Sequence, residues 1–185
     1  MNDMTSGLSD IKKALVLAPH PDDSEFGCGG LLSVLKEQNT EISICVFSLC
    51  EESVPEGFPQ DILKNEQIAS AELIGVKPDN LHFKSYRVRR FDEKRQDILE
   101  DMVALRNSFQ PDLIIMPSLF DVHQDHEVIA KQAMRAFKKC KLLSYELPWN
   151  MIQTRLNFYV SLSEKNLQDK TDMIACFKSQ GIRQY

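Results

Sequence analysis

Residues 18–30 have the sequence APHPDDSEFGCGG, from Ala18 to Gly30. The apolar run that leads into them, 14–18, is typical of a buried strand, and the apolar run that follows, 31–35, indicates a helix. A strand that ends in a histidine and two aspartates and leads into a helix places these side chains at the carboxyl edge of a sheet. Open α/β sheets bind their ligands at that edge.

Asp22 and Asp23 present an electrostatic problem, because adjacent carboxylates at the end of a buried strand repel each other. Such a pair persists when the side chains point apart, are solvated or share a cation. His20 and Asp23 are three residues apart, so a helical or tight-turn backbone brings them to one side and leaves Asp22 pointing elsewhere. They supply two ligands, whereas a catalytic zinc ion takes three from the protein. We therefore expect a third ligand from another part of the chain.

A second cluster lies at residues 117–126, with the sequence PSLFDVHQDH. It follows another apolar run that is typical of a strand, 113–116, and it contains His123 and His126, again three residues apart. Both clusters therefore lie just past the end of a predicted strand. The second cluster can supply the missing ligand if the two strands are neighbours.

Strands and helices alternate along the whole chain, which predicts a single-domain α/β fold over residues 1–185. The expected strands are 14–18, 42–47, 81–83, 113–116 and 142–146, with an edge strand at 157–160. The expected helices are 29–38, 61–73 with Gly75 as its C-cap, 97–109, 127–137 and 167–178. This pattern favours a Rossmann-like, mostly parallel sheet with helices on both faces. In that strand order the first strand lies beside the fourth, so the two clusters meet.

Composition argues against several classes of protein. A net charge of -5 over 185 residues argues against nucleic acid as the main partner, and the basic run 87–90 is interpreted as a solvated loop. Five scattered cysteines without a CxxC pair argue against a disulfide framework or a thiolate zinc site. No apolar run approaches the ~20 residues that span a bilayer, and residues 1–10 are polar. The sequence thus predicts a soluble, cytoplasmic protein without membrane insertion.

The two clusters together resemble the signatures of the PIG-L/LmbE-like superfamily of zinc-dependent N-deacetylases. The first signature is matched by residues 20–23 with Glu25, Gly27, Gly29 and Gly30, and the second by Pro117, Ser118, Asp121, His123, Asp125 and His126. Weaker similarities lie at Glu66-Gln67, Tyr145-Glu146, Pro148-Trp149 and Ser179-Gln180. The resemblance runs in the right order over most of the chain.

The resemblance implies a Rossmann-like fold and hydrolysis of an N-acetyl group, commonly on a glucosamine-type sugar. By position, His20, Asp23 and His126 would bind Zn²⁺, although histidine and aspartate ligands accept other divalent metals. Asp22 would be the general base, and His123, expected to be protonated, would face the oxyanion. Asp125 is expected to orient a histidine. The leaving amine would take its proton from Asp22 or from His123.

The expected substrate is a small N-acetylglucosamine-type conjugate, with a soluble glycoside or nucleotide sugar preferred to a lipid-linked one. Candidate substrate contacts are Lys64, where the family commonly has arginine, together with Tyr145, Trp149 and Arg183. Ser24, before Glu25, is a further departure from the family pattern. Because the chain ends at Tyr185, part of the pocket wall is expected to be missing or to come from a neighbouring subunit in a homo-oligomer.

Three alternatives share these residues. The glycines at 27–30 superficially resemble a dinucleotide loop, but they lack the GxGxxG spacing, and Asp22 and Asp23 would repel a pyrophosphate. A zinc amidase, peptidase or esterase acting on a non-sugar substrate would use the same ligands. A catalytically inactive metal-binding protein would keep the ligands but not the turnover.

Overall fold

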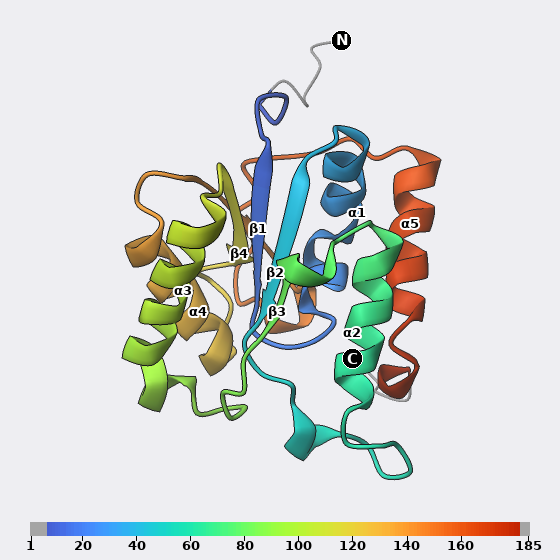
Figure 1. The fold of residues 1–185 in the computed structure, drawn as a ribbon, viewed down its shortest axis with the longest axis vertical. Helices are drawn as coiled ribbons and strands as arrows, with labels where there is room; N and C mark the ends of the chain where they lie inside the picture. Colours follow the sequence, from blue (N-terminus) through green and yellow to red (C-terminus); the bar gives the residue numbers. More distant parts are fainter. Residues whose placement is uncertain (1–6, 182–185) are drawn as a thin grey trace.

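The structure is a computed structural model that describes residues 7–181. Its five strands form one parallel sheet in the order β3-β2-β1-β4-β5 (Figure 1). The strands are β1 (Lys13–Ala18), β2 (Glu41–Val46), β3 (Leu81–Phe83), β4 (Leu113–Pro117) and β5 (Lys141–Tyr145). Ala14 pairs with Leu113 and Val16 with Ile115, so the first strand lies beside the fourth, as the sequence predicts. This confirms the Rossmann-like fold.

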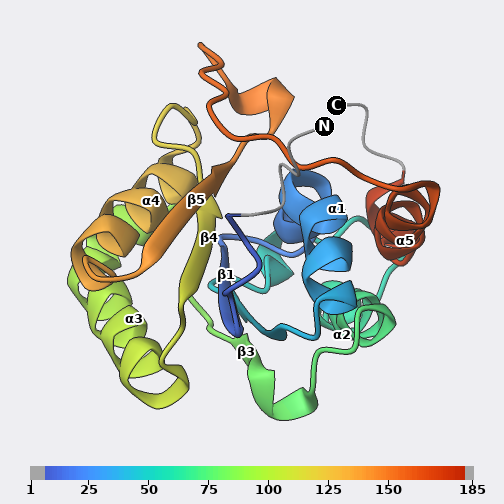
Figure 2. The ribbon, with the colours of Figure 1, turned by 90° about the horizontal axis from the view of Figure 1, so that it is seen from above.

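Helices cover both faces of the sheet, with α1, α2 and α5 on one side and α3 and α4 on the other (Figure 2). They are α1 (Asp23–Glu37), α2 (Ile62–Leu73), α3 (Arg95–Phe109), α4 (Gln124–Ala136) and α5 (Glu164–Ala175). Successive β1 residues point to opposite faces: Val16 joins the core under α1, and Leu15 and Leu17 join the core under α3 and α4. Burial on both faces explains why β1 is continuously apolar.

The first helix begins at Asp23. The sequence pattern predicts a start at residue 29, so this predicted boundary is wrong. Asp22 is its N-cap and adopts a left-handed conformation with φ 79°, so the chain turns sharply between His20 and the helix. The glycines that suggested a loop lie inside the helix because it packs closely there. A Cβ atom on Gly27 would lie 2.3 Å from Cδ2 of Tyr145. The early start places Asp23 in the first helical turn.

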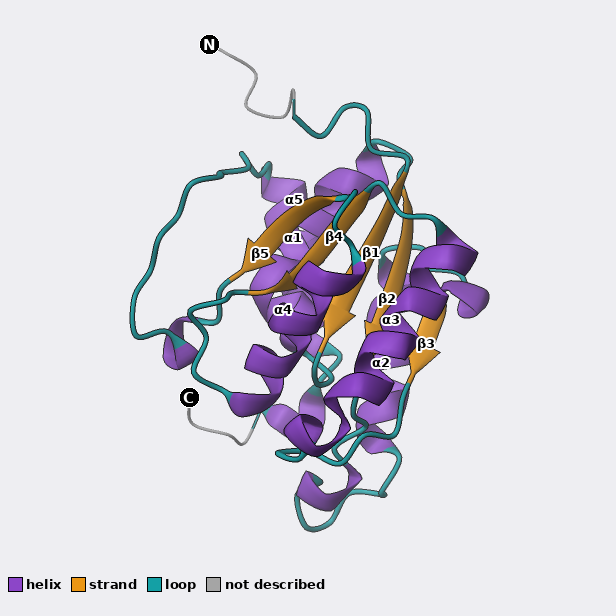
Figure 3. Cartoon of the chain, turned by 90° about the vertical axis from the view of Figure 1, so that its left-hand side faces the viewer, coloured by secondary structure: helices purple, strands orange, loops and turns teal. Residues whose placement is uncertain are grey.

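The expected edge strand at 157–160 is wrong, because residues 153–163 contain neither strand nor helix. Figure 3 shows this part of the chain as a long loop beside the sheet. Elsewhere the expected elements agree with the observed ones to within a few residues. Gly75 ends α2 as predicted, since its φ is 76° and its N–H donates to the Glu72 carbonyl at 3.0 Å. Among residues 7–181, no helix has the length and apolarity needed to cross a membrane.

Candidate metal centre

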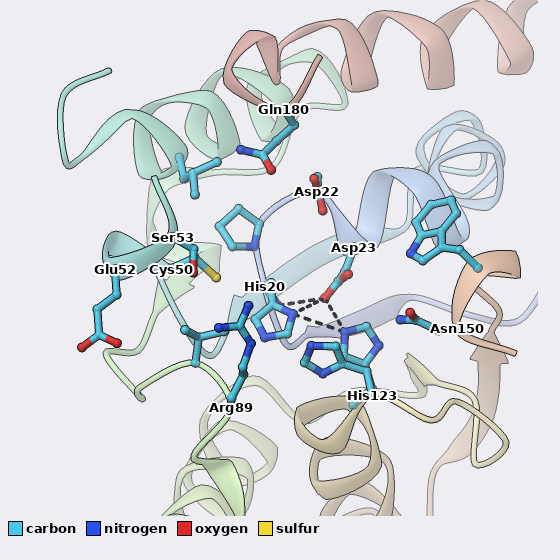
Figure 4. Close-up of a pocket in the computed structure, with 15 residues that line it drawn as sticks. His20, Asp22, Asp23, Cys50, Glu52, Ser53, Arg89, His123, Asn150 and Gln180 are labelled. Atoms are coloured by element: carbon cyan, nitrogen blue, oxygen red, sulfur yellow. Dashed lines mark hydrogen bonds and ion pairs between the residues drawn. The ribbon is translucent and has the colours of Figure 1, made fainter. Parts of the chain in front are cut away.

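Three donor atoms from the two sequence clusters converge where β1 and β4 end. Nδ1 of His20 lies 3.4 Å from Oδ2 of Asp23 and 3.2 Å from Nε2 of His126, and the latter two atoms are 3.3 Å apart (Figure 4). Donors that bind zinc tetrahedrally at about 2.0–2.1 Å lie about 3.3–3.4 Å from one another. The triangle therefore has the size of a face of a zinc coordination sphere.

The outer nitrogen of each of these histidines faces a buried carboxylate. Nε2 of His20 lies 3.0 Å from Oδ2 of Asp125, and Nδ1 of His126 lies 2.8 Å from Oδ2 of Asp121. An ionised carboxylate only accepts hydrogen bonds, so the outer nitrogens carry the hydrogens, and the inner nitrogens of the neutral rings keep their lone pairs. The lone pairs of His20 Nδ1 and His126 Nε2 and the carboxylate of Asp23 are thus all available to one cation at the centre of the triangle. Carboxylates that orient ligand histidines in this way are typical of metal sites.

The same proximity shifts the pKa values of the donors in the metal-free protein. Burial alone would lower the pKa of His126, but the charge of Asp23 and the contacts with Asp121 and Asp23 raise it to about 10. Burial would raise the pKa of Asp23, but the neighbouring imidazoles of His126 and His20 lower it well below its usual range. A proton on His126 and the charge on Asp23 therefore stabilise each other where a cation would otherwise lie.

His123 is the N-cap of α4, and its Nδ1 accepts a hydrogen bond from the Asp125 backbone N–H at 3.2 Å. The neutral ring therefore carries its hydrogen on Nε2. The pKa of His123 is lowered to about 4, mainly by burial and to a smaller extent by the nearby rings of His20 and His126. This differs from the expected protonated imidazole. His123 is better suited to donate a hydrogen bond from a neutral ring.

Nitrogens of His20, His123 and His126 also lie within 4.8 Å of one another, which makes a second ligand set conceivable. The set with Asp23 fits better for two reasons. Its atoms are only 3.2–3.4 Å apart, and it includes an anion to balance a cation. Nδ1 of His123 is already engaged by the Asp125 N–H, and its Nε2 then carries a hydrogen.

Asp22 lines the cavity above the triangle and is 9% exposed. Its position depends on a buried hydrogen-bond network that the sequence pattern does not predict. The Asp22 N–H donates to Oε1 of Gln67 at 3.3 Å, and Nε2 of Gln67 donates to Oε1 of Glu25 at 2.8 Å. Burial raises the pKa of Glu25. The network fixes the turn that separates Asp22 from Asp23.

The cavity has a volume of about 560 Å³, and Trp149 lines it as the sequence predicts. Tyr145 does not: it is 5% exposed, and its hydroxyl donates to the Leu17 carbonyl at 3.2 Å. Lys64 also lies outside the cavity, with Nζ 5.6 Å from the centre of the Phe83 ring. Arg183 lies outside the described residues. Two further residues had no predicted role. Arg89 lines the cavity, and Asp121, which lies within the second signature, faces Nδ1 of His126.

The fold and site define a Rossmann-like α/β protein with a His-Asp-His donor set at the topological switch point of its sheet. Comparison with protein families agrees: the family described as PIG-L, GlcNAc-PI de-N-acetylase, matches residues 15–137. These residues hold all the donor atoms of the triangle and the carboxylates behind them. The chain belongs to the PIG-L family.

Two curated relatives are deacetylases by name. A probable N-acetyl-alpha-D-glucosaminyl L-malate deacetylase 2 of Bacillus subtilis is 25% identical over 145 residues, which cover 69% of this chain and 61% of that protein. A diacetylchitobiose deacetylase of Thermococcus kodakarensis is 25% identical over 126 residues, covering 64% and 46%. The chain thus spans about half to three fifths of the length of these relatives.

A solved structure supports the fold assignment. The N,N'-diacetylchitobiose deacetylase of Pyrococcus horikoshii, complexed with its inhibitor, superimposes with a TM-score of 0.78 at 21% identity. The match covers 97% of this chain and 74% of that one. At this identity the comparison establishes a common α/β fold.

Proposed function

We propose that this protein is a zinc-dependent hydrolase that removes the acetyl group from an N-acetylated amino sugar of the N-acetylglucosamine type. The observation that carries the proposal is the donor triangle of His20, Asp23 and His126 at the floor of a cavity that Asp22 and His123 also line. The description of the family and the names of the two relatives support the sugar class.

Zinc held by His20, Asp23 and His126 would supply a water of lowered pKa and a Lewis acid for the amide oxygen. The chain itself contributes the proton transfers. Asp22 lines the same cavity as the triangle, and its proposed role is to accept a proton from the attacking water. His123 donates a hydrogen bond from Nε2 to the oxygen on which negative charge develops.

Collapse of the tetrahedral intermediate breaks the C–N bond and requires a proton on the leaving nitrogen. Asp22, which has just taken a proton from the water, returns it to the amine. We prefer Asp22 to His123 for this step, because burial lowers the pKa of His123 to about 4 and leaves its neutral ring a weak acid. The products are acetate and the free amino sugar.

The test is acetate release by the zinc-loaded protein from a panel of substrates. The panel contains N-acetylglucosamine glycosides and nucleotide sugars, an acetyl-lysine peptide and an acetate ester. We expect release from N-acetyl sugars and none after Asp22→Asn. Release from the peptide or ester alone would favour the amidase or esterase alternative. Stoichiometric zinc with no release from any substrate would favour an inactive metal-binding protein.

A further inference from the structure

Arg89 has an unusual backbone conformation at the rim of the cavity. Its φ is 64°, in the left-handed region that L residues with side chains rarely adopt. The turn is closed by the Arg90 N–H, which donates to the Arg87 carbonyl at 3.1 Å. The Arg89 N–H donates to Oδ2 of Asp125 at 2.6 Å, the oxygen that also faces His20. The backbone of Arg89 is thereby fixed to the metal centre.

The side chain of Arg89 is directed into the cavity. Figure 4 shows its guanidinium turned toward the space beside His20, whereas the carboxylate of Glu52 turns outward. Of the 15 lining residues, all within the described chain, Arg89 is the one lysine or arginine. Across residues 7–181 its guanidinium has no hydrogen-bond acceptor or ion-pair partner. The neighbouring arginines differ, since Arg87 pairs with Glu52 and Arg90 with Glu93.

Arg89 is exposed at the rim, so its guanidinium is accessible to a ligand in the cavity. A neutral sugar would not need a cation at this place. The cavity otherwise carries the carboxylates of Asp22 and Asp23, and a divalent cation would balance only these two. Glu52 is already engaged by Nε of Arg87 at 3.0 Å. A guanidinium presents a planar set of N–H donors that matches a carboxylate or a phosphate.

We propose that Arg89 forms an anion subsite, so that the preferred substrate carries a carboxylate or phosphate group beside its N-acetyl sugar. This inference rests on the proposed deacetylase function and narrows its substrate class. The negative group would approach the guanidinium from the open side of the cavity while the acetamide lies at the donor triangle.

The variant for the test is Arg89→Asn, because asparagine tolerates a positive φ and removes the charge. The matched control is Arg90→Gln, which removes a charge from the same turn but does not line the cavity. Acetate release is measured for four glycosides of N-acetylglucosamine: the glycolate glycoside, its methyl ester, the 1-phosphate and the methyl glycoside. The first and third are anionic, and the other two are neutral.

For the original protein we expect kcat/KM to be at least tenfold higher on an anionic glycoside than on its neutral counterpart, with the preference falling as salt is added. Arg89→Asn should raise KM tenfold or more on the anionic substrates, with kcat and the neutral substrates little changed. Arg90→Gln should behave like the original protein. Equal rates on charged and neutral substrates would overturn the inference. A uniform loss of kcat in Arg89→Asn would also overturn it, since Arg89 would then act on the reaction centre.

A binding measurement separates this inference from the proposed function. Calorimetry compares the glucosaminide of glycolate with its methyl ester, both already lacking the acetyl group, on zinc-loaded protein. The subsite is supported if the original protein binds the anionic glucosaminide more tightly than the methyl ester and Arg89→Asn binds both equally. This holds even if no acetate is released from any sugar. Acetate release without any anion preference in binding or turnover supports the deacetylase and rejects the subsite.

Discussion

Nδ1 of His20 lies 3.2 Å from Nε2 of His126, and a buried carboxylate behind each ring accepts the hydrogen of its other nitrogen. Two buried nitrogens with lone pairs repel each other unless a proton or a cation lies between them. The carboxylate of Asp23, 3.3–3.4 Å from both, makes the cation more favourable still. In the metal-free protein this positive charge is the proton that His126 holds, and we propose that zinc takes its place.

The first prediction separates metal binding from turnover. His126→Ala should lose stoichiometric zinc, because it removes one donor of the triangle and the imidazole that faces Asp121. Asp22→Asn should keep zinc and lower kcat by about 10²–10⁴-fold, since it removes only the proposed general base. Metal analysis of the purified variants, together with acetate release, checks both. Full activity in Asp22→Asn would exclude Asp22 as the base.

The second prediction concerns protons and follows from the pKa of His126, which Asp23 and Asp121 raise to about 10 although burial opposes them. His126 therefore holds a proton at pH 7 in the metal-free protein, and zinc must displace it. Zinc affinity should rise with pH over the neutral range, and binding should release at least one proton. Calorimetry in buffers of different ionisation enthalpy counts the protons.

The folding stability of the metal-free protein should also change with pH. A histidine with a raised pKa in the folded state contributes stability that is complete below its unfolded pKa of about 6.5 and is lost as pH rises toward about 10. The metal-free protein should therefore lose stability between these values relative to His126→Ala.

Zinc binding that is independent of pH, with no proton release, would contradict the assignment of His126 as a ligand.

The third prediction tests Asp125 as a positioning residue. Its carboxylate is fully buried, faces Nε2 of His20 and accepts from the Arg89 N–H, so Asp125→Asn should misorient the His20 ring. We expect zinc affinity to fall about 10–100-fold. The control is Asp101→Asn, which removes a carboxylate bonded to Lys84 and Tyr86 outside the site. Asp101→Asn should change stability but not zinc affinity, and equal effects of the two variants would argue against a specific role for Asp125.

The fold and the convergence of the two histidine clusters could be predicted because each depends on strong, regular signals. Alternating strands and helices specified the neighbouring positions of β1 and β4, and residue types at the strand ends indicated that the two clusters meet there. The family resemblance then selected His20, Asp23 and His126 within these clusters. Other features depend on contacts that have no local signature. Arg89 lies in a short basic run without periodicity, and its direction depends on a left-handed turn held by Asp125.

The aromatic residues near the site illustrate the same limit. Tyr145 and Trp149 were equally good candidates from the sequence, since either side chain suits a sugar ring or a core. The structure separates them by their neighbours: Tyr145 lies against Gly27 under α1, whereas Trp149 makes a T-shaped ring contact with Phe26 and lines the cavity. Which of the two aromatic residues lines the cavity depends on the position of α1, and the sequence pattern does not specify that position.

The last prediction tests this placement of α1. A Cβ atom on Gly27 would lie 2.3 Å from Cδ2 and 2.7 Å from Cγ of the buried Tyr145 ring, so Gly27→Ala requires the ring or the helix to shift. Such overpacking costs about 1–3 kcal/mol and outweighs the gain of up to about 1 kcal/mol from replacing a helical glycine. The free energy of unfolding should fall, as measured by urea denaturation. In the control Gly7→Ala, the nearest atom is Cε2 of Phe158 at 3.8 Å, an ordinary contact, so stability should be unchanged. If Gly27→Ala proved as stable as the original protein, the close packing of α1 on Tyr145 would be wrong, and with it the reason that this glycine-rich segment is helical.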